Sequence, residues 1–233
     1  MITDLLGKRI GLDPTSRKFV NEIAGAQAIE RESSATYVLP YPSSSGPYKV
    51  MLSGKTAGIT EANLSITGRG FVAGVRNLKL KQDEAQKILL WPIGIIIGWE
   101  SKQDGPTPQI LVTTQSDRTQ PSYRFELSSS SLSRGKDIWV ELDRSKGGAT
   151  DDWLSLGSND TKRISFTVAM RRTNPDGSRN SYTQHDVSFG PENFYRMDFG
   201  KWDGKGEIRF CQAVGSVAPC TLLKNETSTP SPN

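Results

Sequence analysis

Residues 163–189 have the sequence RISFTVAMRRTNPDGSRNSYTQHDVSF, and this stretch decides the fold class. In its first part, four apolar residues alternate with smaller or more polar ones: Ile164, Phe166, Val168 and Met170. Such alternation is typical of a strand with one buried and one exposed face. Pro175 and Gly177 then stand where a tight reversal needs them, and YTQHDVSF can pair back on the first strand. The sequence therefore predicts a β-hairpin.

Short runs of the same kind, separated by turn residues, continue through residues 48–223. The 22 glycines and 13 prolines of the chain fit a fold with many turns. A single β-sandwich or barrel often reaches about 200 to 250 residues. We therefore expect residues 48–223 to form one all-β domain, an antiparallel sandwich with a jelly-roll-like arrangement as one form of it.

The most apolar run is ILLWPIGIIIGW, residues 88–99. It is well short of the roughly 20 residues that a membrane-spanning helix needs, so no membrane span is expected. Pro92 and Gly94 interrupt the run, and its isoleucines favour a strand. The run is therefore predicted to be one buried strand with a bulge.

The N-terminal part has a different pattern. Asp13 can cap free backbone amides, Pro14 suits a first helical turn, and apolar residues recur at helical spacing at Phe19, Ile23, Ala26 and Ile29. This pattern predicts one helix within Pro14–Glu32. The Pro- and Ser-rich segment that follows and the polar residues at the C-terminus are expected to be extended arms. We therefore divide the chain into a helix with an arm (1–47), a β-sandwich domain (48–223) and a polar tail (224–233).

The formal net charge of +4 is modest, and the Lys and Arg residues are spread along the chain. Basic pairs occur at residues 8–9, 17–18 and 171–172. They permit a nucleic acid as partner but do not by themselves indicate one. The N-terminus lacks the pattern of a signal peptide, so we expect synthesis inside the cell, or a processed or viral particle protein.

Cysteine and histidine are scarce. One His and two Cys cannot build a thiol-based zinc cluster, and no cofactor is expected. Cys211 and Cys220 flank the short segment QAVGSVAP. They can form a disulfide or remain two reduced core residues, and the sequence leaves both open.

The segment WVELDRSK, residues 139–146, carries the strongest hint of a ligand site. Glu141 and Asp143 are two apart on a predicted strand, so both face one side together with Trp139. Such a set can bind a sugar or act on one. The segment resembles the E-x-D-x-x-E strand motif of laminarinase-like β-sandwich glycosidases, but Lys146 stands where that family has its second glutamate, the general acid. The other interpretation is an exposed strand face with alternating charge.

A second cluster of acidic residues lies in DFGKWDGKGE, residues 198–207. Asp198, Asp203 and Glu207 stand among glycines, as in an oxygen-rich loop that could bind a calcium ion. A hairpin turn between two strands explains the same residues without a metal.

The sequence assembles no complete active site. The terminal extensions are costly to order on a lone domain, and they gain most if neighbouring subunits bury them. We therefore expect a non-enzymatic structural subunit that forms a homo-oligomeric shell, tube or fibre, with a virion coat or capsid protein as one example. The alternative is a carbohydrate-binding or carbohydrate-cleaving β-sandwich.

Overall fold

A computed structural model of the 233-residue chain describes residues 1–13, 15–30, 34–40, 46–54, 59–68, 70–81, 84–91, 96–114, 119–129, 131–143, 152–190, 194–212 and 219–226. The regular structure of these residues is entirely β-strand. The strands are β1 (Ile2–Thr3), β2 (Arg9–Leu12), β3 (Phe19–Asn21), β4 (Gln27–Glu30), β5 (Ala35–Val38), β6 (Tyr48–Ser53), β7 (Ile59–Gly68), β8 (Phe71–Lys81), β9 (Ala85–Trp91), β10 (Ile96–Glu100), β11 (Gln109–Thr114), β12 (Ser122–Ser129), β13 (Asp137–Asp143), β14 (Trp153–Ser158), β15 (Ile164–Thr173), β16 (Arg179–Phe189), β17 (Phe194–Asp198), β18 (Ile208–Gln212) and β19 (Cys220–Leu223). No helix capable of crossing a membrane occurs in this part of the chain.

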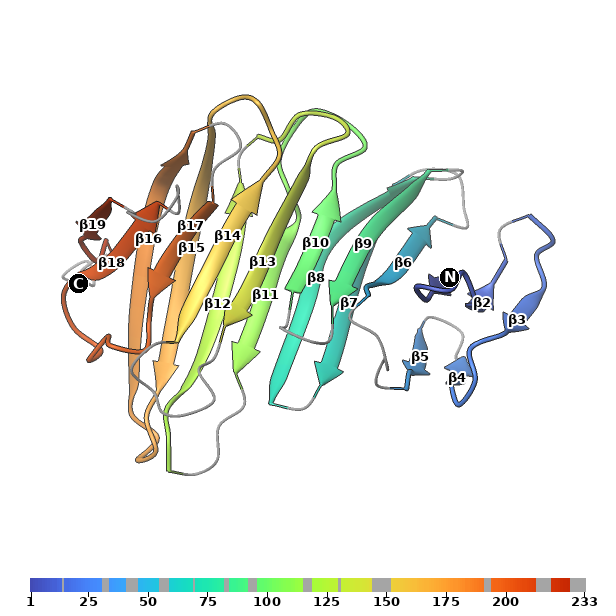
Figure 1. Cartoon of the computed structure of the whole chain (residues 1–233), viewed down its shortest axis with the longest axis horizontal. Helices are drawn as coiled ribbons and strands as arrows, with labels where there is room; N and C mark the ends of the chain where they lie inside the picture. Colours follow the sequence, from blue (N-terminus) through green and yellow to red (C-terminus); the bar gives the residue numbers. More distant parts are fainter. Residues whose placement is uncertain are drawn as a thin grey trace.

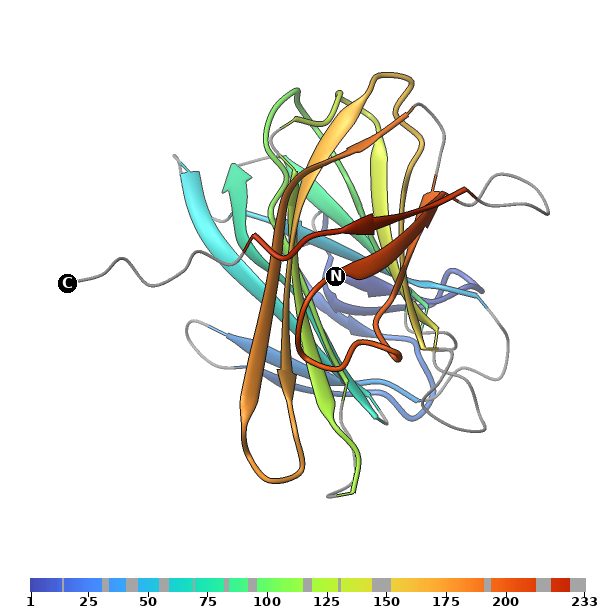
Figure 2. The ribbon, with the colours of Figure 1, turned by 90° about the vertical axis from the view of Figure 1, so that its left-hand side faces the viewer.

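The strands form two large antiparallel sheets and one small one. An 11-stranded sheet has the order β19-β18-β17-β14-β13-β10-β9-β6-β1-β2-β3, and we call it the long sheet. The short sheet has six strands in the order β16-β15-β12-β11-β8-β7, and β4 pairs with β5 alone. From β7 to β18, successive hairpins enter the short and the long sheet in alternation. Figure 2 shows the two sheets as separate layers. The predicted all-β, antiparallel class is confirmed.

One buried cluster contains residues of both large sheets. Alternate residues of β12 point into it, including Tyr123 and Phe125. Phe199, which directly follows β17 of the long sheet, lies with its ring centroid 4.8 Å from each of these two rings, in an edge-on arrangement. Aromatic pairs of this geometry stabilise a core beyond the area that they bury. The three rings therefore join the two layers.

The hairpin predicted from residues 163–189 is confirmed. β15 pairs with β16 from Ile164 opposite Phe189 to Thr173 opposite Arg179. The backbone N–H of Gly177 donates to the carbonyl of Asn174 at 2.9 Å, and Gly177 adopts a φ of 85°, which favours glycine. Local turn chemistry therefore predicted this element correctly.

The apolar run at residues 88–99 forms two strands, so the prediction of a single bulged strand is wrong. β9 and β10 are antiparallel, with Trp91 opposite Ile96. Residues 92–95 lie outside the described residues. Because both strands sit in the middle of the long sheet, each has apolar residues on both faces, and the alternation that marks separate strands is lost. Ile97 faces the core and is 1% exposed, whereas Ile96 faces outward and is half-buried.

The predicted N-terminal helix is also wrong, because strands β3 and β4 lie within Pro14–Glu32, and the described residues around them are in turns and bends. Asp13 does accept hydrogen bonds from the backbone N–H groups of Thr15 and Ser16, each at 2.9 Å, as a helix cap would. These contacts instead stabilise the turn between β2 and β3. Arg17 and Gly25 have φ angles of 54° and 77°, which a right-handed helix cannot accommodate. Pairing of β3 with β2 and of β4 with β5, together with burial of Ile23 and Ala26 in the core, overrides the helical spacing of the apolar residues.

The two predicted arms contribute to the sheets where the structure describes them. Residues 35–38 are strand β5, and β1 to β3 extend the long sheet beyond β6. At the other end of the chain, Asn225 Oδ1 accepts a hydrogen bond from the N–H of Thr183 at 3.0 Å, and a Glu226 carboxylate oxygen accepts one from the N–H of His185 at 2.9 Å. The first residues of the predicted tail therefore cover part of the free edge of β16, which would otherwise be open to another strand. Residues 227–233 lie outside the described residues.

Candidate functional site

The long sheet extends past the short sheet at its N-terminal end, where β2 to β5 lie beyond β7 and β8 (Figure 1). We call strands β1 to β5 the N-terminal overhang. Seven large hydrophobic side chains are exposed in the described part of the chain, and six of them lie on or between the strands of the overhang: Leu5, Leu6, Leu12, Phe19, Ile29 and Val38. The seventh is Leu222, on β19 at the opposite end of the long sheet. Single exposed hydrophobic residues are common, but a gathering of them indicates an interaction site.

The register of β2 and β3 explains why two of these side chains are exposed. Leu12 and Phe19 stand directly opposite each other, and Leu12 is two residues after Ile10 and so on the same face of β2. Ile10 is fully buried in the core, whereas Leu12 and Phe19 are 42% and 44% exposed. The apolar face of the long sheet therefore continues beyond the residues that the rest of the molecule covers.

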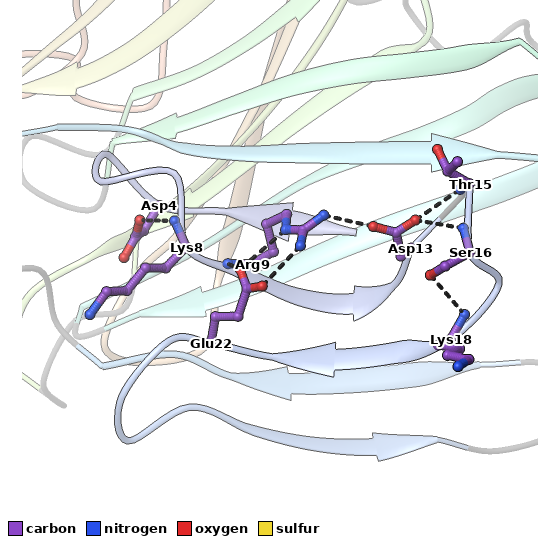
Figure 3. A network of polar contacts seen from close by, with 8 residues as sticks. All are labelled: Asp4, Lys8, Arg9, Asp13, Thr15, Ser16, Lys18 and Glu22. Atoms are coloured by element: carbon purple, nitrogen blue, oxygen red, sulfur yellow. Dashed lines mark hydrogen bonds and ion pairs between the residues drawn. The ribbon is translucent and has the colours of Figure 1, made fainter.

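A network of polar contacts crosslinks β2 and the segments on either side of β3 (Figure 3). The guanidinium of Arg9 donates to both carboxylate oxygens of Glu22, at 3.1 and 2.9 Å, and to Asp13 at 2.6 Å. The hydrogen bonds and the charge of Arg9 lower the pKa of Glu22. The pKa of Asp13 is lowered first by the backbone N–H groups of Ser16 and Thr15 and also by the charge of Arg9. Leu12 and Phe19 thus lie on two paired strands whose ends are crosslinked by these contacts.

The small sheet of β4 and β5 packs against the same region. Gly11 on β2 has a φ of +117°, and a Cβ there would lie 3.2 Å from the hydroxyl oxygen of Tyr37 on β5. Ile23 and Ala26, which connect β3 to β4, are buried in the core cluster. A two-stranded hairpin is marginally stable by itself, so these contacts hold it in place. The free edge of β3 ends the long sheet and offers backbone groups to another strand.

The candidate glycan residues lie on the outward face of β13. Trp139, Glu141 and Asp143 alternate with buried residues of this strand. Partial burial, and then the charge of Asp143, raise the pKa of Glu141, and the charge of Arg196 opposes this shift. The ring of Trp139 covers Gly157 of β14, where a Cβ would come within 2.3 Å of the ring. This face therefore combines an aromatic ring with two carboxylates, and Lys146 lies outside the described residues.

The candidate metal residues have separate local contacts. Asp198 is buried, and its carboxylate lies 3.7 Å from the ammonium of Lys201. Asp203 Oδ1 accepts a hydrogen bond from the N–H of Lys205 at 2.8 Å, in the connection between β17 and β18. The described residues contain no group of three or more acidic, Cys or His side chains placed to hold a metal ion. The contacts favour the hairpin interpretation of this segment.

Cys211 and Cys220 form a disulfide between directly opposed positions of β18 and β19, with their Cα atoms 4.0 Å apart. The bond closes a loop with a sequence separation of 9 residues at the edge of the long sheet.

Reduction of this disulfide is expected to lower the melting temperature by roughly 5–10 °C. A crosslink that closes a loop of this length raises the free energy of the unfolded state by about 2.6 kcal/mol, and each kcal/mol corresponds to roughly 2–4 °C for a chain of this size. The measurement is a thermal melt with and without a reducing agent, with the Cys211→Ser, Cys220→Ser double variant as control. The double variant should melt like the reduced parent and should not respond to the reducing agent. Identical melts of the oxidised and reduced parent would contradict the prediction.

No family model, curated protein or solved structure matches this chain.

The sequence placed Glu141 and Asp143 on one strand face, and the outward positions of β13 agree with that placement. It missed the exposed pair of Leu12 and Phe19, because the helix prediction covered Phe19. The only sequence signal for this pair is the alternation of apolar and other residues in RIGL and FVN. These segments of four and three residues are too short for such an alternation to be told from chance.

Proposed function

We propose that this chain is a non-enzymatic structural subunit that self-assembles through its N-terminal overhang into a homo-oligomeric shell, tube or fibre. A virion coat or capsid protein is one example. The observation that supports the proposal is the gathering of six of the seven exposed large hydrophobic side chains on the overhang. The jelly-roll-like arrangement stays a prediction, and the proposal does not depend on it.

The overhang offers two features that an interface between copies uses. Apolar side chains such as Leu12 and Phe19 provide area that gains from removal from water. The unpaired edge of β3 can add a strand from a neighbouring copy. Because the Arg9 network fixes the strands beforehand, little conformational entropy would be lost on contact.

Replacing Leu12 and Phe19 together by Ser is expected to abolish or shrink the assembly. Both side chains are exposed, so the fold should change in stability by only about 0.5 kcal/mol for each substitution. Size-exclusion chromatography with light scattering measures the mass of the particles, and a melt of each variant confirms folding. The matched control is Leu222→Ser, which removes an exposed apolar side chain at the other end of the long sheet and should assemble like the parent.

Two outcomes would contradict the proposal. The parent chain could remain monomeric at high concentration, or the Leu12→Ser, Phe19→Ser variant could form particles of the parental size.

The alternative function, binding or cleavage of a carbohydrate, is favoured by one surface. Trp139, Glu141 and Asp143 share the outward face of β13, and Trp153 of β14 stands opposite Asp143. The guanidinium of Arg209 lies 5.5 Å from the centroid of the Trp153 ring, whereas the Trp139 ring lies over a glycine and on the same strand face as both carboxylates, so Trp139 is the ring to test as a stacking platform. A monomeric parent whose tryptophan fluorescence changes with an added oligosaccharide, and a Trp139→Ala variant without that response, would favour this alternative.

A further inference from the structure

The outward face of the short sheet carries two neighbouring hollows that share Thr113 and Arg124. The smaller has a volume of about 190 Å³ and lies over β11, β12, β15 and β16; the larger, of about 670 Å³, lies over β7, β8, β11 and β12. Together they cross all six strands of the sheet. With a strand spacing of about 4.8 Å, this track is about 24 Å long. It is therefore too extended for one small ion.

Four arginines line the track, and none of the described lining residues is acidic: Arg76, Arg124, Arg171 and Arg179. We call this surface the arginine track. The β-sheet register brings three of them into one group. Arg124 stands directly opposite Arg171, and Arg179 stands opposite Thr173, two residues further along β15. Like charges at directly opposed positions destabilise a sheet, so this arrangement has a cost in the free protein that a bound anion would remove.

Little negative charge in the protein offsets these arginines. Arg124 forms an ion pair with Glu126 at 2.6 Å, and the second carboxylate oxygen of Glu126 accepts a hydrogen bond from Gln109 at 3.0 Å. Within the described part of the chain, no carboxylate pairs with Arg76, Arg171 or Arg179. The two residues of the basic pair at 171–172 make different contacts. The guanidinium of Arg172 donates to the backbone carbonyl of Trp202 at 2.5 Å, so Arg172 is not on the arginine track. Arg171 is exposed on the track.

The chemistry of the track fits phosphate groups arranged along a chain. Guanidinium groups bind phosphate through paired N–H donors, and the hydroxyls of Thr113, Ser122 and Thr173 can donate to the same oxygens. Among the described lining residues the only aromatic one is Tyr123, and it is buried against Phe125 and Phe199. Bases therefore have no stacking platform on this face, and contact with the backbone would be independent of sequence.

We propose that the arginine track binds the sugar–phosphate backbone of a nucleic acid without base specificity. The site lies on the outward face of the short sheet, apart from the N-terminal overhang, so it goes beyond the proposed assembly function and does not rest on it. The Leu12→Ser, Phe19→Ser variant should keep its affinity for nucleic acid even if assembly is lost. Failure of one proposal is therefore distinguishable from failure of the other.

The test is fluorescence anisotropy of a labelled 20-nucleotide oligo-dT with the full chain, over a series of salt concentrations. Neutralising four phosphates of a single strand predicts a slope of about −3 for log K against log salt concentration. Arg171→Gln should flatten this slope by about 0.7 and weaken binding roughly fivefold at about 0.1 M salt. Arg196→Gln is the matched control, because it removes an exposed arginine from the outward face of the long sheet and should bind like the parent. Glu126→Gln should bind more tightly, since it removes the carboxylate that competes for Arg124.

Further measurements distinguish a nucleic-acid backbone from free phosphate and from other polyanions. A mixed-sequence oligonucleotide of the same length should bind as tightly as oligo-dT, and inorganic phosphate should compete only weakly. The proposal is overturned if the parent shows no salt-dependent binding, or if Arg171→Gln and Arg196→Gln weaken binding equally while both variants melt like the parent. It is also overturned if inorganic phosphate displaces the oligonucleotide at equal concentration, or if heparin binds and oligonucleotides do not.

Discussion

Replacing Ile97 by Asp is expected to unfold the protein or to lower its free energy of unfolding by about 3–5 kcal/mol, while the same change at Ile96 should cost about 1–2 kcal/mol, mostly because the new carboxylate would stand opposite Glu141. Ile97 is 1% exposed and faces the core, so an aspartate there would be a buried charge without a partner. Ile96 faces outward on the same strand, opposite Glu141 of β13, where water still reaches the side chain. Urea denaturation of the two variants beside the parent measures the difference.

The pair of variants tests the register of β10 and not only its burial. A slip by one residue would exchange the faces of Ile96 and Ile97 and reverse the order of the two effects. Equal destabilisation by the two substitutions would contradict the two-sided environment of this strand.

Strands with local signals could be predicted from the sequence. The hairpin at residues 163–189 has polar and apolar residues in alternation and a turn with Pro175 and Gly177, and all of this information lies within 27 consecutive residues. The run at residues 88–99 lacks that alternation, because its outward positions, such as Leu89 and Ile96, are apolar as well as its core-facing ones. The number of strands in it could not be predicted from the pattern of apolar residues alone.

The N-terminal region shows why local signals can mislead. Asp13 makes the contacts of a helix cap, and apolar residues recur at helical spacing, but Phe19 pairs with Leu12 and β1 pairs with β6 far along the chain. These pairings contribute free energy that a short isolated helix lacks. Arg17 and Gly25 have positive φ angles in the turns of this region. A glycine favours such a conformation, but nothing in the sequence indicates it at Arg17.

The surface sites were predicted to different extents for the same physical reason. Glu141 and Asp143 are two residues apart, so strand geometry alone places them on one face. Arg76, Arg124 and Arg171 belong to three strands and meet only through the order of the short sheet. A modest and evenly spread charge in the sequence therefore becomes a local cationic track in the fold.

Replacing Phe199 by Ala is expected to lower the free energy of unfolding by about 3–5 kcal/mol. The ring is fully buried and lies 4.8 Å from the rings of Tyr123 and Phe125, so the change removes contacts with both and leaves a cavity between the two sheets. Phe194→Ala is the matched control, because Phe194 is on the same strand region but is half-buried, beside the guanidinium of Arg196. It should cost no more than about 1.5 kcal/mol, and chemical denaturation followed by circular dichroism measures both variants. If Phe199→Ala cost as little as the control, the aromatic cluster would not be what joins the layers. The N-terminal overhang and the arginine track both depend on the stacked sheets. The Phe199→Ala variant should therefore assemble and bind the oligonucleotide like the parent at temperatures where it is folded. It should lose both properties at the temperature at which it unfolds.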